Sequence, residues 1–367
     1  MGRKKEMKEL ASIIKNFRKG ELDVKLDEEH VERWLSQFSE ESQDVILAET
    51  TRIFSRWYFN RDYIKNEFLD KVIDELMQRY SFQSIDDLCN NVVFISMQKI
   101  GQSQKILVDM LEKCLAKKYD VSLQKKATDG QRIFVYLDDG LYSGKRAQKE
   151  LLPLIEELPE GCTLDAFFML VYLGSFRSVE KQIKDKFENK KINLNMFFRN
   201  GLETDKYIEY TDWGYNYNTH QEHLWPSHQL RSIPEFAQYG DWVVQELQSR
   251  ESKAVKYVYR SGLWENDAGI FSSVQNRNIV EREFFLQGLK IYESLSEPKG
   301  KYPLGYNTYP SFGFGSFCAS DLNISNTCPL VLWWGNLEKH GDALDSWYPL
   351  LLRRTNPKAD GMEPCAW

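Results

Sequence analysis

Two adjacent aspartates and the glycine-containing segment after them are the residues of this chain best suited to chemistry. The apolar run Ile133–Leu137 ends at Asp138 and Asp139, the segment Gly140–Gly144 comes next, and a helical pattern begins at about Lys145. In open α/β sheets, ligands bind at the carboxyl ends of the strands. We therefore expect the two carboxylates to meet a ligand that carries hydroxyl groups, a metal ion, or both.

The segment after the aspartates has the properties of a phosphate-binding loop. A tight loop that runs into a helix N-terminus directs several backbone N–H groups at one point, and the helix dipole favours an anion there. Ser143 adds a hydroxyl donor, and Lys145 or Arg146 adds a full positive charge. A ribose 5-phosphate satisfies the whole set, with its phosphate in the loop and its hydroxyl groups on the aspartates. The alternative is a solvated turn in which Ser143 is an ordinary helix N-cap. The expected loop consists of Gly140, Leu141, Tyr142, Ser143, Gly144, Lys145 and Arg146.

The string IFVYLDDGLYSGKRAQKEL resembles the signature with which type I phosphoribosyltransferases bind 5-phosphoribosyl pyrophosphate (PRPP). The resemblance implies that Asp138 and Asp139 hold the ribose hydroxyls and that the loop holds the 5-phosphate. Two positions depart from the family pattern. Tyr142 stands where many nucleobase-using members carry an acid, and Arg146 replaces a common Thr or Ser. The first departure weakens the expectation of a purine acceptor and leaves PRPP binding intact.

A second segment, VVFISMQKIGQSQ, also reads as a strand, a short loop and a helix. It lies one strand–helix unit earlier, where the family places the loop that binds pyrophosphate. The resemblance therefore implies that Lys99, Gly101, Gln102 and Ser103 supply donors for the leaving group. Without the acidic motif this segment would say little, because many strand–helix turns contain Gly and Ser.

The implied reaction is displacement of pyrophosphate at C1 of the ribose. The cofactor expected from the resemblance is Mg²⁺, held through PRPP and within reach of Asp138 and Asp139. Magnesium would stabilise the charge on the leaving pyrophosphate. The two aspartates would orient the ribose and offset the positive charge that develops on it. The sequence does not identify the acceptor.

The hydrophobic pattern divides the chain into three regions. Residues 1–88 show stripes typical of amphipathic helices, residues 89–200 alternate short apolar runs with helical patterns, and residues 201–367 form an insertion and a C-terminal part that would complete the core and cover the site. Unbroken apolar runs that alternate with helices favour a parallel sheet covered on both faces. We therefore expect an α/β fold with a parallel sheet, an N-terminal helical region and a C-terminal irregular extension. The resemblance implies that the sheet is a type I phosphoribosyltransferase-like core. Strands are expected at 92–97, 133–137, 167–174, 192–198 and 329–334, helices near 106–115, from 145, at 178–187 and at 276–292, and an irregular insertion at 200–275.

The composition points to a globular cytoplasmic protein. The chain has 367 residues, 42% of them hydrophobic, and a net charge of −6, which is unlike a strongly basic nucleic-acid binder. Its cysteine spacings fit no zinc ribbon, so we expect reduced thiols. No apolar run approaches the length of a membrane span, and no apolar segment follows the basic N-terminus as in a secretory signal.

Three functions remain open on the sequence alone. The first is a phosphoribosyltransferase, a pentosyl glycosyltransferase, and the second is a non-catalytic sensor of PRPP or a nucleotide. The third comes from the strings WLSQF, PSFGFGSF and LVLWWG, which resemble a phosphoribosyltransferase-like group found in bacterial anti-phage gene clusters, including some retrons. That resemblance implies an antiviral defence component whose partner is a nucleic acid or a reverse transcriptase. The oligomeric state is not indicated.

Overall fold

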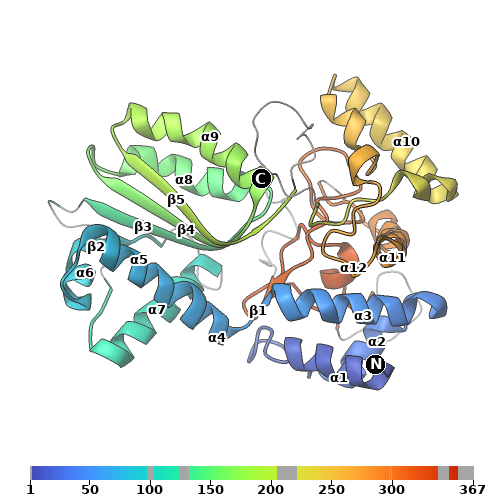
Figure 1. The fold of residues 1–367 in the computed structure, drawn as a ribbon, viewed down its shortest axis with the longest axis horizontal. Coiled ribbons are helices and arrows are strands. Elements are labelled where there is room, and N and C mark those ends of the chain that lie inside the picture. Colours follow the sequence, from blue (N-terminus) through green and yellow to red (C-terminus); the bar gives the residue numbers. More distant parts are fainter. Residues whose placement is uncertain are drawn as a thin grey trace. The chain divides into compact units, whose positions relative to one another are not determined.

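The computed structural model describes residues 2–96, 103–123, 130, 132–204, 221–296, 298, 300–337 and 347–353. The chain divides into two compact units (Figure 1). One unit contains the residues up to Asn60 together with those from Glu203 onward, and the other is Arg61–Leu202. The division differs from the expected boundary near residue 88, because the helices between residues 61 and 91 pack with the sheet rather than with the N-terminal helices.

The unit Arg61–Leu202 is built on four parallel strands in the order β2-β3-β4-β5. The expected parallel sheet is therefore confirmed. Its two central strands are almost wholly buried, which explains why they read as continuous apolar runs. The strands are β2 (Val92–Phe94), β3 (Ile133–Leu141), β4 (Thr163–Tyr172) and β5 (Asn193–Leu202).

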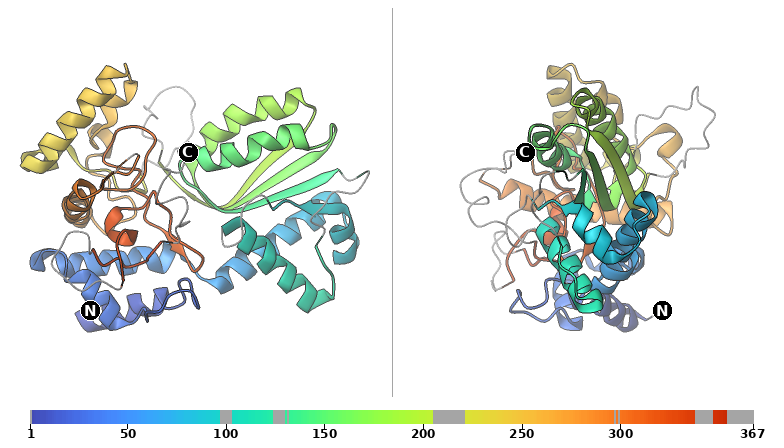
Figure 2. Two further views of the ribbon diagram at one scale, coloured as in Figure 1. Left: turned by 180° about the vertical axis from the view of Figure 1, so that it is seen from behind. Right: turned by 90° about the vertical axis from the view of Figure 1, so that its left-hand side faces the viewer.

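Helices cover both faces of this sheet. Helices α8 (Lys145–Glu157) and α9 (Leu173–Asn189) lie on one face, and α5 (Asp70–Tyr80) and α7 (Ser103–Tyr119) lie on the other (Figure 2). The unit also contains α4 (Arg61–Tyr63), a π-helical segment (Ile64–Leu69) that leads into α5, and α6 (Ile85–Asn91).

The core under α8 and α9 comes from alternate residues of the strands. Phe134 and Tyr136 of β3 share this face with Phe168 of β4, and Leu151 of α8 packs into the same cluster. Successive side chains of a strand point to opposite faces, so the residues between them belong to the face covered by α5 and α7. Each fully buried large apolar side chain in this cluster stabilises the fold by about 1.5–3 kcal/mol.

The other unit joins the N-terminal helices to the C-terminal half of the chain. The indole Nε1 of Trp34 donates a hydrogen bond to the carbonyl oxygen of Val331 at 3.0 Å. The short strands β1 and β6 pair in parallel. Its elements are α1 (Arg3–Ile14), α2 (Glu28–Leu35), α3 (Glu40–Trp57), β1 (Tyr58–Phe59), α10 (Pro234–Ser249), α11 (Val274–Glu293), β6 (Ala319–Ser320), α12 (Leu330–Trp333) and three short 3₁₀ helices at His228–Ser232, Lys253–Tyr257 and Gly262–Trp264.

Two expectations for this unit are wrong. The run at 329–334 forms the short helix α12 instead of a strand. The supposed insertion at 200–275 contains α10, a helix of 16 residues. A signal for α10 was present: Pro234 occupies its first turn, and Phe236, Tyr239, Gly240, Val243 and Leu247 are buried at spacings of three and four.

A buried ionic network holds the segments that precede α11. The guanidinium groups of Arg260 and Arg277 both bind the carboxylate of Glu281, at 3.3 and 2.9 Å, and all three side chains are fully buried. Arg277 also lies 3.4 Å from the carboxylate of Asp267 and donates to the backbone oxygen of His223 at 2.7 Å. Such a network keeps buried charges compensated, and it fixes the path of a loop-rich region.

No helix in the described residues is both long and apolar enough to cross a membrane.

His30 of α2 holds the chain at residues 348–350 through both ring nitrogens. Its Nε2 lies 2.8 Å from the carbonyl oxygen of Leu350, and its Nδ1 lies 2.7 Å from the hydroxyl of Tyr348. A carbonyl only accepts, so Nε2 carries the proton and Nδ1 of the neutral ring accepts from the tyrosine. Burial lowers the pKa of His30, and the hydrogen bond to Leu350 offsets only part of that effect.

The lowered pKa of His30 predicts a loss of stability in mild acid. The unfolded chain takes up a proton on this residue near its ordinary pKa of about 6.5, whereas the folded chain resists it. The stabilising contribution is therefore complete above about pH 6.5 and declines as the pH falls toward the folded-state pKa. Between pH 6.5 and 5.5 we expect the free energy of unfolding to fall more in the wild type than in His30→Gln, by at most about 1 kcal/mol. Equal slopes in denaturant titrations of the two proteins would contradict this role.

Candidate functional site

The turn between β3 and α8 is shorter than the sequence indicated. Gly140 and Leu141 still pair with Leu170 and Val171 of β4, so they are strand residues rather than loop residues. The connection consists of residues 142–144, and α8 begins at Lys145. The expected order of strand, acidic pair, tight turn and helix is nevertheless present.

Gly144 makes this turn sterically possible. Its φ of +80° lies in the left-handed region, which residues other than glycine rarely adopt. A Cβ atom at this position would lie 2.2 Å from Cγ2 of Val179 in α9. The glycine therefore allows both the backbone reversal and the close approach of the turn to α9.

The first turn of α8 offers backbone N–H groups that the helix itself cannot use. Within the described part of the chain, no hydrogen bond takes up the N–H of Ser143 or Gly144. Ser143 is half-buried, and its side chain does not cap α8. The ring of Tyr142 lies over Gly140, where an added Cβ would approach Cε2 to 2.4 Å, and it packs against the ring of Tyr172. The turn thus presents backbone N–H donors at the helix N-terminus, beside the rings of Tyr142 and Tyr172.

Asp138 lies inside the protein, on the face of the sheet that α8 covers. Its side chain is only 1% exposed. One carboxyl oxygen lies 3.1 Å from the hydroxyl of Tyr136, and the other accepts the backbone N–H of Asp139 at 2.9 Å. The Tyr136 hydroxyl also lies 2.6 Å from Oε2 of Glu150 in α8.

This arrangement requires a proton on one of the two acids. A tyrosine hydroxyl has one hydrogen to donate, yet two carboxyl groups lie within hydrogen-bonding distance of the Tyr136 oxygen. Nε of Arg146 donates to the other carboxyl oxygen of Glu150 at 3.0 Å. Burial and the neighbouring Asp139 raise the pKa of Asp138 well above its ordinary value, and Arg146 offsets only part of this. Asp138 is therefore harder to ionise in the folded protein than in the unfolded chain.

Arg146 is both anchored and accessible. Burial lowers the pKa of its guanidinium, but the acids Asp138, Glu150 and Asp139 more than offset this and raise it above the ordinary arginine value. The side chain remains 35% exposed, so part of the guanidinium can still reach a ligand. The turn and the first turn of α8 therefore hold a fixed positive charge.

Asp139 belongs to the opposite face of the sheet. It is half-buried, and it follows Asp138, so its side chain leaves the strand on the side of α5 and α7. The registers Asp138↔Phe168↔Phe198 and Gly140↔Leu170↔Asn200 place it level with Arg199 of β5, two strands away. The two aspartates that the sequence presented as a pair thus have different environments, and Asp139 is the more accessible one.

The expected pyrophosphate loop lies largely outside the described residues. Lys99, Gly101 and Gln102 belong to the part that is not described, and Ser103 is the first residue of α7, with 7% of its surface exposed. The strand before it is confirmed but shorter than expected, because β2 ends at Phe94. The role of these four residues stays a prediction.

The described residues do not form a metal site on their own. No cluster of three or more His, Cys, Asp or Glu side chains suited to a metal ion occurs among them. Asp138 is only 1% exposed and its pKa is raised, so it is poorly placed to bind Mg²⁺, which prefers accessible ionised oxygen donors. Asp139 offers one accessible carboxyl group, and the expected binding of Mg²⁺ through PRPP stays a prediction.

Sequence reasoning missed Tyr136 and Glu150. Tyr136 lies two residues before Asp138, on the same face of β3, and Glu150 follows Arg146 by four residues in α8. Both spacings could have indicated contact, since alternate strand residues share a face and i, i+4 residues meet on a helix.

Removal of the Tyr136 hydroxyl should loosen this site. In Tyr136→Phe, Asp138 and Glu150 lose the group that links them, and we expect the free energy of unfolding to fall by about 1–2 kcal/mol. Chemical denaturation at pH 7 measures the change, with Tyr119→Phe at an exposed position as the control. A loss no larger than that of the control would show that the hydrogen bonds of Tyr136 with Asp138 and Glu150 do not stabilise the fold.

A comparison with known protein families gives a match that covers most of the chain. The model of the PRTase-CE family matches residues 31–353. Neither the search of curated proteins nor the search of solved structures gave a match. The family match includes β3, the acidic pair, the turn and α8. The chain belongs to the PRTase-CE family and is a phosphoribosyltransferase-like protein.

Proposed function

We propose that the protein binds PRPP together with Mg²⁺ at the carboxyl end of β3 and transfers its phosphoribosyl group to an acceptor. The observation that carries this proposal is the turn at residues 142–144. It follows the last strand residues after Asp139 and presents backbone N–H groups at the N-terminus of α8, with Arg146 beside it. A sugar phosphate needs this combination of an oxygen acceptor for its hydroxyls and an anion site for its phosphate.

In the proposed complex, Asp139 accepts hydrogen bonds from the ribose hydroxyls, and the turn binds the 5-phosphate. Asp138 acts from inside the sheet, where its carboxyl group fixes the backbone N–H of Asp139. Bound Mg²⁺ would offset negative charge on the pyrophosphate. The bond between C1 and the pyrophosphate oxygen breaks, the acceptor forms the new bond to C1, and Asp139 offsets positive charge on the ribose.

Release of pyrophosphate is the direct test of this activity. The protein would be incubated with PRPP, Mg²⁺ and either nucleobases, nucleotides or cell extract. We expect pyrophosphate to form with the wild type and not with the variant in which Asp138 and Asp139 are both Ala. Turnover that survives this double change would contradict the assignment of the site.

A non-catalytic sensor of PRPP or a nucleotide is the second candidate. Tyr142 favours it, because its aromatic ring packs over Gly140 and against Tyr172 where a catalytic acid would help a nucleobase. A sensor would gain thermal stability with PRPP and release no pyrophosphate under any of the acceptor conditions. Turnover with any acceptor would exclude it.

A role in anti-phage defence, with a nucleic acid or a reverse transcriptase as partner, rests on the sequence resemblance alone. Co-purification of nucleic acid, or gel shifts that weaken as salt increases, would support a nucleic-acid partner. Unchanged phage plating after loss of the protein would argue against the defence role.

A further inference from the structure

Glu150 of α8 connects the first turn of this helix to the buried sheet. One of its carboxyl oxygens accepts from Nε of Arg146 at 3.0 Å, and the other lies 2.6 Å from the hydroxyl of Tyr136 in β3. Tyr136 is fully buried, whereas the side chains of Glu150 and Arg146 are 14% and 35% exposed. The three side chains therefore form a line of contacts that begins in the core and ends at the N-terminus of α8.

The order of the charges along α8 is unfavourable for the helix itself. Its first turn contains Lys145 and Arg146 and no acid, although the helix dipole favours negative charge there. An ion pair at i, i+4 also stabilises a helix less when the cation precedes the acid, as Arg146 precedes Glu150. Helix stabilisation is therefore a poor explanation of this pair. A positive charge at this end of α8 becomes favourable when an anion binds there.

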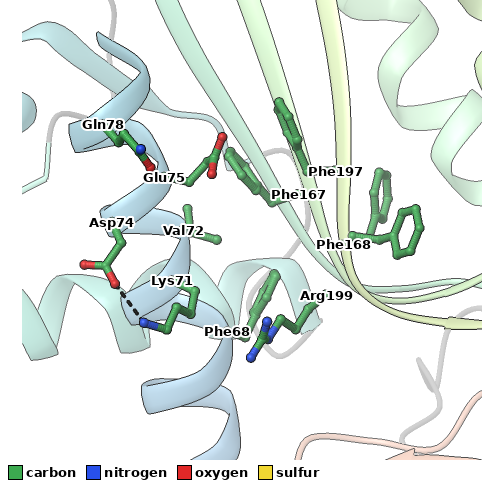
Figure 3. A pocket seen from close by; sticks show the side chains of 11 residues that line it. Phe68, Lys71, Val72, Asp74, Glu75, Gln78, Phe167, Phe168, Phe197 and Arg199 are labelled. Carbon is green, nitrogen blue, oxygen red and sulfur yellow. Dashed lines mark hydrogen bonds and ion pairs between the residues drawn. The ribbon is translucent and has the colours of Figure 1, made fainter. Parts of the chain in front are cut away.

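Two other ion pairs of this unit lie at the surface and have no such anchor. Lys71 and Arg199 line a pocket on the α5 side of the sheet (Figure 3), and they pair with Asp74 and Glu67, each at 3.0 Å. All four side chains are at least 45% exposed, so solvent screens these pairs and they fix their partners weakly. Glu150 differs from the two surface acids because a buried hydroxyl lies against its second oxygen.

The contact with Glu150 restrains Arg146 without using the end of its guanidinium. Arginine has many rotamers, and fixing one of them when a ligand binds costs conformational entropy. An anchor at Nε limits these rotamers before any ligand arrives. The same contact does not occupy the Nη groups, which suit phosphate oxygens. Glu150 can therefore order Arg146 and still leave it able to bind an anion.

From these contacts we propose that Glu150 is a positioning residue, which orients Arg146 toward the 5-phosphate of PRPP and is itself held by Tyr136. The inference rests on the proposed function, in which Arg146 and the turn at residues 142–144 bind that phosphate. Glu150 contacts no ligand. It strengthens PRPP binding only through Arg146, so its effect disappears when the arginine is absent.

Calorimetric titration with PRPP and Mg²⁺ tests this role in four full-length proteins: the wild type, Glu150→Ala, Arg146→Ala and the double variant. We expect Glu150→Ala to weaken PRPP binding about tenfold, which corresponds to the cost of ordering one long side chain on binding. In the Arg146→Ala background the same substitution should have no further effect. Equal losses in the two backgrounds would show that Glu150 acts on the fold in general and would overturn the proposal.

Glu150→Gln provides a conservative variant with the same shape. Its amide oxygen can still accept from Nε of Arg146, so we expect PRPP affinity within about threefold of the wild type. The matched control is Glu246→Ala in α10, which removes the acid of another i, i+4 pair, with Arg250 at 3.3 Å. The control should leave PRPP affinity unchanged. Circular dichroism would establish that each variant is folded.

NMR relaxation of the Nε–H group of Arg146 measures the anchor without any ligand. We expect this group to be ordered in the wild type and in Glu246→Ala, and mobile in Glu150→Ala and Tyr136→Phe. A group that is equally mobile in all four proteins would overturn the positioning role. An ordered Arg146 in a wild type that binds no PRPP would confirm the anchor and contradict the proposed function. PRPP binding that Glu150→Ala leaves unchanged would do the reverse.

Discussion

Replacing Asp139 by Asn should weaken PRPP binding about 10- to 150-fold, because a hydrogen bond to an ionised partner contributes about 1.5–3 kcal/mol. Asp139 is half-buried on the open side of β3, and in the proposed complex it accepts from the ribose hydroxyls. Asparagine keeps the size of the side chain and removes its charge. Calorimetric titration with PRPP and Mg²⁺ measures the effect.

Asp138→Asn is the matched variant, and it should behave differently. Asp138 is fully buried and its pKa is raised, so the folded protein holds the carboxyl proton more tightly than the unfolded chain does. A raised carboxyl pKa gives stability that is complete below the unfolded pKa of about 3.9 and is lost as the pH rises. Asparagine imitates the protonated acid without this loss. We therefore expect equal or greater stability at pH 7 and PRPP affinity within about threefold of the wild type.

Equal losses of PRPP affinity in the two variants would contradict the separation of roles. Equal losses would mean that Asp138 leaves its contacts with Tyr136 to reach PRPP, so that its buried position is not the one it has in the complex. If only Asp138→Asn lost PRPP affinity, Asp138 rather than Asp139 would be the residue that contacts the ribose hydroxyls.

Gly144→Ala should lower the free energy of unfolding by about 2–4 kcal/mol and abolish measurable PRPP binding. About 1–2 kcal/mol comes from the left-handed backbone at φ +80°, and the remainder from the clash with Val179. Binding is lost because the turn can no longer direct the N–H groups of Ser143 and Gly144 at the phosphate. Denaturant titration and calorimetry measure the two effects.

Gly161→Ala is the control for backbone strain alone. Gly161 has φ +75°, but an added Cβ there would meet no atom within 4 Å. Its substitution should cost only about 1–2 kcal/mol and leave PRPP binding intact. In the double variant Gly144→Ala/Val179→Ala, removal of the valine methyls should restore part of the stability that Gly144→Ala loses. Identical losses for the two glycines, without rescue, would show that the turn is not packed against α9.

The sheet could be predicted because its physical signal is local. Residues such as Phe167–Val171 of β4 are buried on both faces, so they form an unbroken apolar run that is typical of a parallel strand. Helix α10 was missed although its apolar stripe was present, because neighbouring Tyr, Trp, Asn and His residues obscured the period. Leu330–Trp333 was taken for a strand because four consecutive apolar residues do not distinguish a strand from a buried helix.

The order of the site elements was predictable, whereas the environments of its side chains were not. Adjacent residues of a strand must point to opposite faces, so Asp138 and Asp139 could have been separated by alternation alone. The raised pKa of Asp138 could not be predicted, because it depends first on burial beneath α8, and only the packing of α8 on β3 brings Glu150 and Arg146 to Tyr136. The boundary at Asn60 likewise depends on long-range contacts, such as the one between Trp34 and Val331.

Calorimetric titration of the wild-type protein with PRPP, in the presence and absence of Mg²⁺, is the decisive test of the proposed PRPP site. We expect saturable binding at one site per chain, tighter with Mg²⁺, and weaker for ribose 5-phosphate, which lacks the pyrophosphate. Absence of heat and of thermal stabilisation with PRPP at millimolar concentration, in a protein shown to be folded, would contradict it.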